Sequence, residues 1–167
     1  MKKIFIVFTF VALAVISAQA QSRQNHLMFS AGYLYERGLD ATVSISHETR
    51  YHNAWEYFAS YYLKYDTDEN AGHITKDSFW HNYNTWWIGA AYKPCVARGR
   101  NNHGNIRAGA FVGSDMDYVI GGGTLGYEHS YALRGGYEFF FQLKEDFVIK
   151  GKDNFRTGVE LGMKIPL

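Results

Sequence analysis

The stretch Ala41-Thr42-Val43-Ser44-Ile45-Ser46-His47 decides the fold. From Ala41 to Ser46, apolar and hydroxyl side chains alternate strictly, so that odd-numbered residues form one face and even-numbered residues the other. Such alternation predicts a β-strand with one apolar and one polar face. The polar face continues through Glu48 and Arg50, which gives it small and charged side chains.

The same period of two recurs on both sides of this segment. Together with 41–51, the expected strands are 27–35, 55–65, 79–92, 105–113, 131–142, 147–150 and 158–165. Polar and glycine-containing connections separate them, at 36–39, 51–53, 67–77, 94–104, 115–129, 143–146 and 151–155. The sequence therefore predicts an all-β chain, an eight-stranded antiparallel up-and-down β-barrel of the outer-membrane type.

The N-terminus has the pattern of a cleaved secretory signal peptide. Lys2 and Lys3 precede an apolar run from Ile4 to Ile16, and Ala18-Gln19-Ala20 supplies the small residues of a cleavage site. The alternative, a membrane-anchoring helix, needs roughly 20 apolar residues, and this run is shorter. We expect residues 1–20 to be the signal peptide and residues 21–167 a single β-barrel domain of an exported protein.

Composition agrees with an exported β-protein. Aromatic residues make up 17% of the chain and there are only 2 prolines, as strand-rich proteins favour. The single cysteine, Cys95, cannot form an intrachain disulfide. Without Lys2 and Lys3 the chain has 15 basic against 16 acidic residues, so charge gives no argument for direct nucleic-acid binding, and none is expected.

The alternation separates an apolar face from a polar face, but it does not by itself show which face points into the barrel. A membrane barrel turns the apolar face to lipid, whereas a soluble periplasmic barrel or sandwich buries it. Small hydroxyl and charged residues suit a narrow lumen, and Trp55, Tyr65, Trp87 and Tyr137 near strand ends suit an interfacial girdle. These features favour the outer membrane, with its lipid bilayer as a partner, over the periplasm. Threaded from the periplasm, such a barrel places 36–39, 67–77, 115–129 and 151–155 outside.

Charged residues of both signs are expected inside the barrel. They are Glu48, Arg50, Glu56, Lys64, Arg107, Arg134, Glu138, Glu160 and Lys164. Charges in a narrow lumen must pair, because unpaired burial is costly. An ion-paired plug is therefore favoured over a gated pore.

Two motifs point weakly to bound ligands. The GxGxxG at 121–126 lacks the helix that a dinucleotide site requires. Seven histidines are scattered along the chain, and His73 and His129 are expected to share the outer rim with Asp68, Glu69, Asp115 and Asp117. Solvated loop residues are the favoured interpretation, so we expect no cofactor, no cofactor-binding residues and no metal ligands.

Other motifs give no catalytic site. Ser46-His47 and His129-Ser130 are adjacent pairs, and adjacent strand residues point to opposite faces, so neither pair can act as nucleophile and base. Arg98-Gly99-Arg100 is too short a basic cluster to bind DNA, and a solvated turn is favoured. We expect no catalytic residues and no enzymatic activity.

Four stretches carry a resemblance to a known family. They are Trp55-Glu56-Tyr57, Gly89–Tyr92 with Ile106–Gly109, Gly136–Phe141 leading to Glu145–Val148, and Gly158–Ile165. In order and spacing the chain resembles the conjugative-transposon protein TraO family of Bacteroidetes over most of residues 21–167. The resemblance implies a structural, non-catalytic outer-membrane component of a conjugal DNA-transfer apparatus, with other envelope proteins of that apparatus as partners. The alternative is a free-standing small outer-membrane barrel for envelope integrity, adhesion or small-solute passage.

Overall fold

The structure is a computed structural model. It describes residues 22–35, 37–49, 51–68, 71–80, 82–115 and 117–167. The expected signal peptide at 1–20, and Arg50 and Glu69, lie outside the described residues. Within them, no helix is both long enough and apolar enough to cross a membrane.

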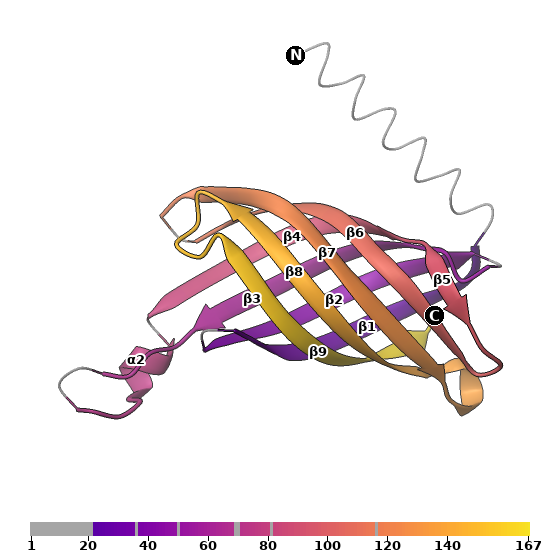
Figure 1. Ribbon diagram of the computed structural model, residues 1–167, viewed down its shortest axis with the longest axis horizontal. Helices are drawn as coiled ribbons and strands as arrows, with labels where there is room; N and C mark the ends of the chain where they lie inside the picture. Colours follow the sequence, from indigo (N-terminus) through magenta and orange to yellow (C-terminus); the bar gives the residue numbers. More distant parts are fainter. Residues whose placement is uncertain (1–21, 36, 50, 69–70, 81, 116) are drawn as a thin grey trace, which may run out of the picture.

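Eight antiparallel strands close into a barrel (Figure 1). They are β1 (Ser22–Leu34), β2 (Gly38–Thr49), β3 (Ala54–Lys64), β4 (Tyr83–Lys93), β6 (Asn102–Ser114), β7 (Val119–Ala132), β8 (Glu138–Ile149) and β9 (Phe155–Pro166). Each pairs with its neighbours along the chain, while β1 pairs with β9 and β4 pairs with β6. The predicted number of strands and the barrel are confirmed.

The period of two sets which side chains enter the barrel. Along β2, the even-numbered residues from Gly38 to Glu48 are buried, whereas Val43 and Ile45 are 47% and 43% exposed. The neighbouring strands continue the arrangement, because Ser44 lies opposite Met28 on β1 and opposite Phe58 on β3. The polar face therefore points inward and the apolar face outward, as a membrane barrel requires.

Two strands lie elsewhere than predicted. The segment 119–132, expected to be mostly a connection, is β7, and 138–149 is one continuous strand, β8, rather than two strands separated by a turn at 143–146. The reversal between them is at 133–137, where Gly135 and Gly136 have φ of 79° and 83°. Glycine is disfavoured in strands, but at Gly122 a Cβ would lie 1.9 Å from the carbonyl oxygen of Phe147, so a glycine is required there.

The connection at 94–104 was also interpreted wrongly. Part of it is the short strand β5 (Cys95–Arg98), which pairs with the start of β6 through Cys95 and Asn105 and extends beyond the barrel (Figure 1). The expected strand at 79–92 begins only at Tyr83, since Phe79 belongs to the short helix α2 (Lys76–Trp80).

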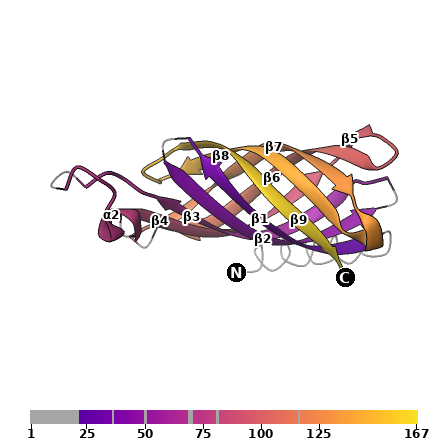
Figure 2. The ribbon, with the colours of Figure 1, turned by 90° about the horizontal axis from the view of Figure 1, so that it is seen from below.

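The barrel has two distinct ends (Figure 2). We call one the helix end; it carries α2 and the described parts of the connections that follow β1, β3, β6 and β8. The other, the terminus end, carries 51–53, 94–101 with β5, a 3-10 turn at Arg134–Gly136, and both Ser22 and Leu167. The connections therefore lie at the ends of the barrel at which they were predicted, apart from the connection wrongly placed at 143–146.

Candidate functional site

The helix-end half of the interior is filled by an apolar cluster. Its members are Leu34, Phe58, Tyr62, Tyr83, Trp87, Ala91, Phe111, Ile120 and Val148. Trp87 is 1% exposed, so its expected place in an outer girdle is wrong. The guanidinium of Arg156 lies 4.0 Å from the ring centre of Tyr62 and donates to Thr85 at 2.8 Å. Aromatic rings thus close this half and hold a buried cation against their faces.

A carboxylate cluster lies beside the apolar cluster and extends to the middle of the barrel. The ammonium of Lys144 contacts Asp40, lies 3.2 Å from Asp146 and lies 2.6 Å from Glu160. Ser30 donates to Glu160 at 2.7 Å. One lysine thus forms ion pairs with three carboxylates on three different strands, and these ion pairs link β2, β8 and β9.

A second network crosses the middle of the interior. The guanidinium of Arg107 donates to Glu56 at 3.0 Å and to Thr124 at 2.8 Å, and it also lies over the ring of Phe58. The ammonium of Lys93 lies 3.3 Å from the same carboxylate of Glu56. Arg107 and Lys93 are at most 3% exposed, so these are fully buried ion pairs.

The network continues to the terminus end. Glu128 accepts from Lys93 and lies 2.9 Å from Lys164, whose ammonium is 3.1 Å from Glu138. Glu56, Arg107, Lys93, Glu128, Lys164 and Glu138 are called the ion-pair chain below. Three carboxylates and three cations alternate along it, so its charges balance.

Imidazoles complete the interior at the terminus end. His26 and His103 are buried, and His52 lies on the turn between β2 and β3. Its Nδ1 is 2.5 Å from Oε1 of Glu48, and its ring stacks on that of His103 with 4.4 Å between centres.

Little open space remains between these groups. A cavity beside Met28, Ser44 and Arg107 has a volume of about 10 Å³, which is room for a single water at most. Paired charges and packed rings therefore fill the described interior. This geometry fits the predicted plug of paired charges.

The outer face has the layering of a membrane barrel. Exposed aromatic side chains lie toward both ends: Tyr33, Tyr61, Trp86, Phe147 and Phe155 toward the helix end, and Trp55, Tyr92, Tyr131, Tyr137 and Phe139 toward the terminus end. Between them lie exposed aliphatic side chains such as Val43, Ile88 and Leu161. Two aromatic bands around an aliphatic belt are typical of a barrel in a bilayer.

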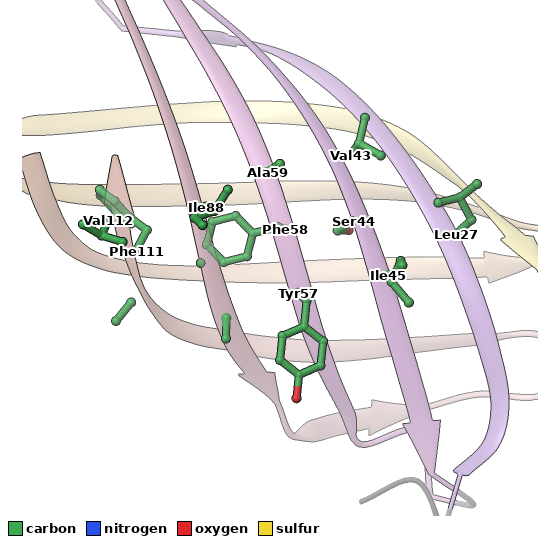
Figure 3. Close-up of a pocket in the computed structure, with 13 residues that line it drawn as sticks. Leu27, Val43, Ser44, Ile45, Tyr57, Phe58, Ala59, Ile88, Phe111 and Val112 are labelled. Carbon is green, nitrogen blue, oxygen red and sulfur yellow. The ribbon is translucent and has the colours of Figure 1, made fainter. Parts of the chain in front are cut away.

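An open groove of about 760 Å³ lies on this outer face (Figure 3). Leu27, Ile45, Tyr57, Ile88 and Val112 border it, and the small side chain of Ala59 contributes to its hollow shape. None of its lining residues is charged. It therefore suits contact with hydrocarbon rather than a polar ligand.

The structure separates the predicted inward charges into groups. Glu48, Glu56, Arg107, Glu138, Glu160 and Lys164 are buried inside as expected. Lys64 is half-buried at the helix end, where it pairs with Asp153 at 2.8 Å. Arg134 is exposed on the turn between β7 and β8, so its inward placement is wrong.

Six inward charges were missed. They are Asp40, Lys93, Glu128, Lys144, Asp146 and Arg156. Asp40 lies on the same face of the strand as Thr42 and Ser44, but it was not predicted to point inward because the predicted strand began at Ala41. Glu128 and the pair Lys144 and Asp146 were lost because their segments were interpreted as connections.

The remaining candidate motifs are dispersed. His129 faces outward on β7 near the terminus end, where it meets the hydroxyl of Tyr127 at 2.9 Å, so the expected rim shared with His73 and Asp115 does not form. Ser46 is buried, whereas the neighbouring His47 is partly exposed and meets Asn25 on the outer side. The GxGxxG at 121–126 lies inside strand β7.

Comparison with known proteins supports the fold. No protein-family model matches the sequence, and no curated protein matches it. Among solved structures, the chain is similar to Neisserial surface protein A, NspA, with a TM-score of 0.57 and 14% identity over 86% of this chain and 95% of that chain. It is also similar to a de novo designed transmembrane β-barrel, with a TM-score of 0.56 and 10% identity over the same shares. The chain thus has the closed eight-stranded antiparallel barrel fold of these membrane proteins.

Proposed function

We propose that this chain is a non-catalytic outer-membrane protein whose barrel is a closed, rigid membrane anchor. The observation that carries the proposal is the filled interior, in which the apolar cluster and the ion-pair chain occupy the lumen from end to end. A pore needs a continuous aqueous path, and the interior of an eight-stranded barrel is just wide enough for its own side chains or one small ligand. Its activity then resides in its ends, which carry the α2 connection and the β5 hairpin.

The membrane part of the proposal rests on the outer face. The aliphatic belt and the two aromatic bands suit lipid and would be costly to expose to water. Because both termini lie at one end, the terminus end faces the periplasm and the helix end faces the exterior. The word surface in the name of the similar Neisserial protein agrees with this orientation.

Reconstitution into planar bilayers tests the anchor proposal. We expect heat-sensitive gel migration, which reports an intact barrel, together with no ion conductance above the protein-free background. Steady single-channel conductance from the folded protein would show that the lumen opens, and the pore alternative would replace the anchor. Failure to enter bilayers, with release from native membranes by carbonate, would refute the membrane assignment itself.

From the resemblance to the TraO family, we further propose that the barrel is a structural component of a conjugal DNA-transfer apparatus. The β5 hairpin and the connection with α2 are the segments that extend beyond the barrel and offer contact surfaces (Figure 1). Deletion of the gene in a donor cell, with complementation, should reduce transfer frequency by orders of magnitude. Unchanged transfer would leave the free-standing envelope protein, acting in integrity or adhesion, as the better account.

A further inference from the structure

Three histidines surround Glu48 inside the terminus end of the barrel. The ligand atoms of Glu48, His52 and His103 lie within 4.8 Å of one another, and so do those of His26, Glu48 and Glu138. Nδ1 of His26 is 3.8 Å from Oε2 of Glu48, on the other side of the carboxylate from His52. Glu48 therefore belongs to both groups and lies at their centre.

Among the described side chains, no lysine or arginine lies within 4.0 Å of the carboxylate of Glu48, and Lys164, which acts on it from further away, is already paired with Glu128 and Glu138. The ion-pair chain uses its own three carboxylates and three cations, and the ion-pair partners of Glu48 within 4.0 Å are His26 and His52. With neutral imidazoles, this leaves one excess negative charge at a buried position. Such a charge is neutralised by a proton, on a histidine or on Glu48 itself, or is balanced by a metal ion.

His26 distinguishes these two cations. Its side chain is 1% exposed, and neither ring nitrogen has a hydrogen-bond partner among the described residues. Buried polar atoms without a partner are rare in folded proteins. A proton shared by His52 and Glu48 would balance the carboxylate but leave His26 unsatisfied, whereas a metal ion would use the lone pair of an imidazole nitrogen.

The cluster is held in place by its surroundings. His52 adopts the left-handed backbone conformation, with φ of 60°, and its carbonyl accepts a hydrogen bond from the buried Asn105 at 2.7 Å. His26 and His103 are fixed on β1 and β6. The side chain of His52 is 39% exposed, which leaves the cluster a route to solvent at this end.

We infer that the terminus end of the barrel binds one divalent transition-metal ion through His26, Glu48 and Glu138, with His52 and His103 beside the site. An imidazole nitrogen together with carboxylate oxygens suits zinc and neighbouring borderline ions better than calcium or magnesium, which prefer oxygen ligands alone. Bond lengths near 2.0–2.1 Å in a tetrahedral zinc site place ligand atoms roughly 3.3 Å apart. The ligand atoms of His26, Glu48 and Glu138 lie within 4.8 Å of one another, with 3.8 Å between His26 and Glu48, so each separation has to shorten by about 1.5 Å at most.

Metal binding by the folded barrel tests this inference. The protein should carry no polyhistidine tag and should have Cys95→Ser as background, because this thiol lies at the same end and could bind metal by itself. In detergent micelles, we expect equilibrium dialysis to give one zinc(II) per chain. Cobalt(II) as a probe should give the intense visible absorption of a tetrahedral nitrogen and oxygen site. The variants are His26→Gln and Glu48→Gln, with His47→Gln as the matched control on the opposite face of β2.

We expect zinc affinity to fall at least ~10-fold in either site variant and to be unchanged in the control. Mutation of residues that only contact a metal ligand already lowers metal affinity by about 10–100-fold, so loss of a ligand should do no less. Heat-sensitive gel migration verifies that each variant is folded, and Glu138→Gln replaces any variant that is not. No stoichiometric zinc on the folded background protein would overturn the inference and leave a proton as the cation. Zinc binding unchanged by both site variants, or lost equally in His47→Gln, would also overturn it.

Discussion

The buried ion pair between Arg107 and Glu56 offers the sharpest test of the filled interior. In Arg107→Met, Glu56 keeps Lys93, but the ion-pair chain then has three carboxylates and only two cations. Removing one partner of a buried pair costs about 3–5 kcal/mol, because the other charge stays buried and uncompensated. Taking a urea m-value of about 2 kcal/mol/M, the unfolding midpoint in lipid vesicles should fall by roughly 1.5–2.5 M.

The double variant Arg107→Met with Glu56→Gln separates charge from packing. In this variant Lys93 and Lys164 still face Glu128 and Glu138, so the charges balance again. Replacing a whole buried pair is often close to neutral, and we expect most of the stability to return. Arg37→Met is the control, because the pair of Arg37 with Asp66 has side chains 50% and 67% exposed and should contribute under about 1 kcal/mol. An Arg107→Met effect as small as the control, or no recovery in the double variant, would refute the reasoning.

Three further predictions concern other parts of the barrel. Leu161→Arg places a charge on the aliphatic belt, where it should cost about 2–4 kcal/mol in lipid vesicles, and an unchanged urea midpoint would contradict a lipid-facing position. Trp87→Ala empties the centre of the apolar cluster and should cost about 3–5 kcal/mol by the same assay, whereas a near-neutral effect would place Trp87 outside the core. Arg134→Ala should leave the urea midpoint unchanged because Arg134 is exposed on a turn. A large fall in the midpoint would indicate that the side chain of Arg134 lies inside the barrel.

The sequence was most informative where alternation was strict. In 41–49 the hydroxyl side chains, and in 158–165 the glycines, occupy every second position and therefore lie on one face of the strand. Both strands and their inward faces could be predicted from this alternation. In β7, Gly121 to Gly123 lack side chains to alternate, and glycine lowers strand propensity, so the strand could not be recognised. Only the register with β8 shows that a glycine is needed where the strands approach closely.

Charge was misleading in β8 for a physical reason. Lys144, Glu145 and Asp146 together have the composition of a turn, yet Lys144 and Asp146 point inward and form an ion pair there. Asp40, another partner of Lys144, is 104 residues away in the sequence, so no local pattern indicates the pairing. The histidine cluster was missed likewise, because His26, His52 and His103 meet only when the barrel closes.

Spin labelling tests the central claim, a membrane-spanning barrel with an outward apolar face, most directly. Single cysteines in a Cys95→Ser background, placed at Val43, Ile88 and Leu161 on the aliphatic belt and at Tyr118 on the helix-end connection, would carry the label in lipid vesicles. We predict that the three belt labels collide with oxygen dissolved in the bilayer and are shielded from a water-soluble nickel reagent, while the label at Tyr118 meets the nickel reagent. Belt labels as accessible to the nickel reagent as the label at Tyr118 would contradict the account and favour a barrel in water.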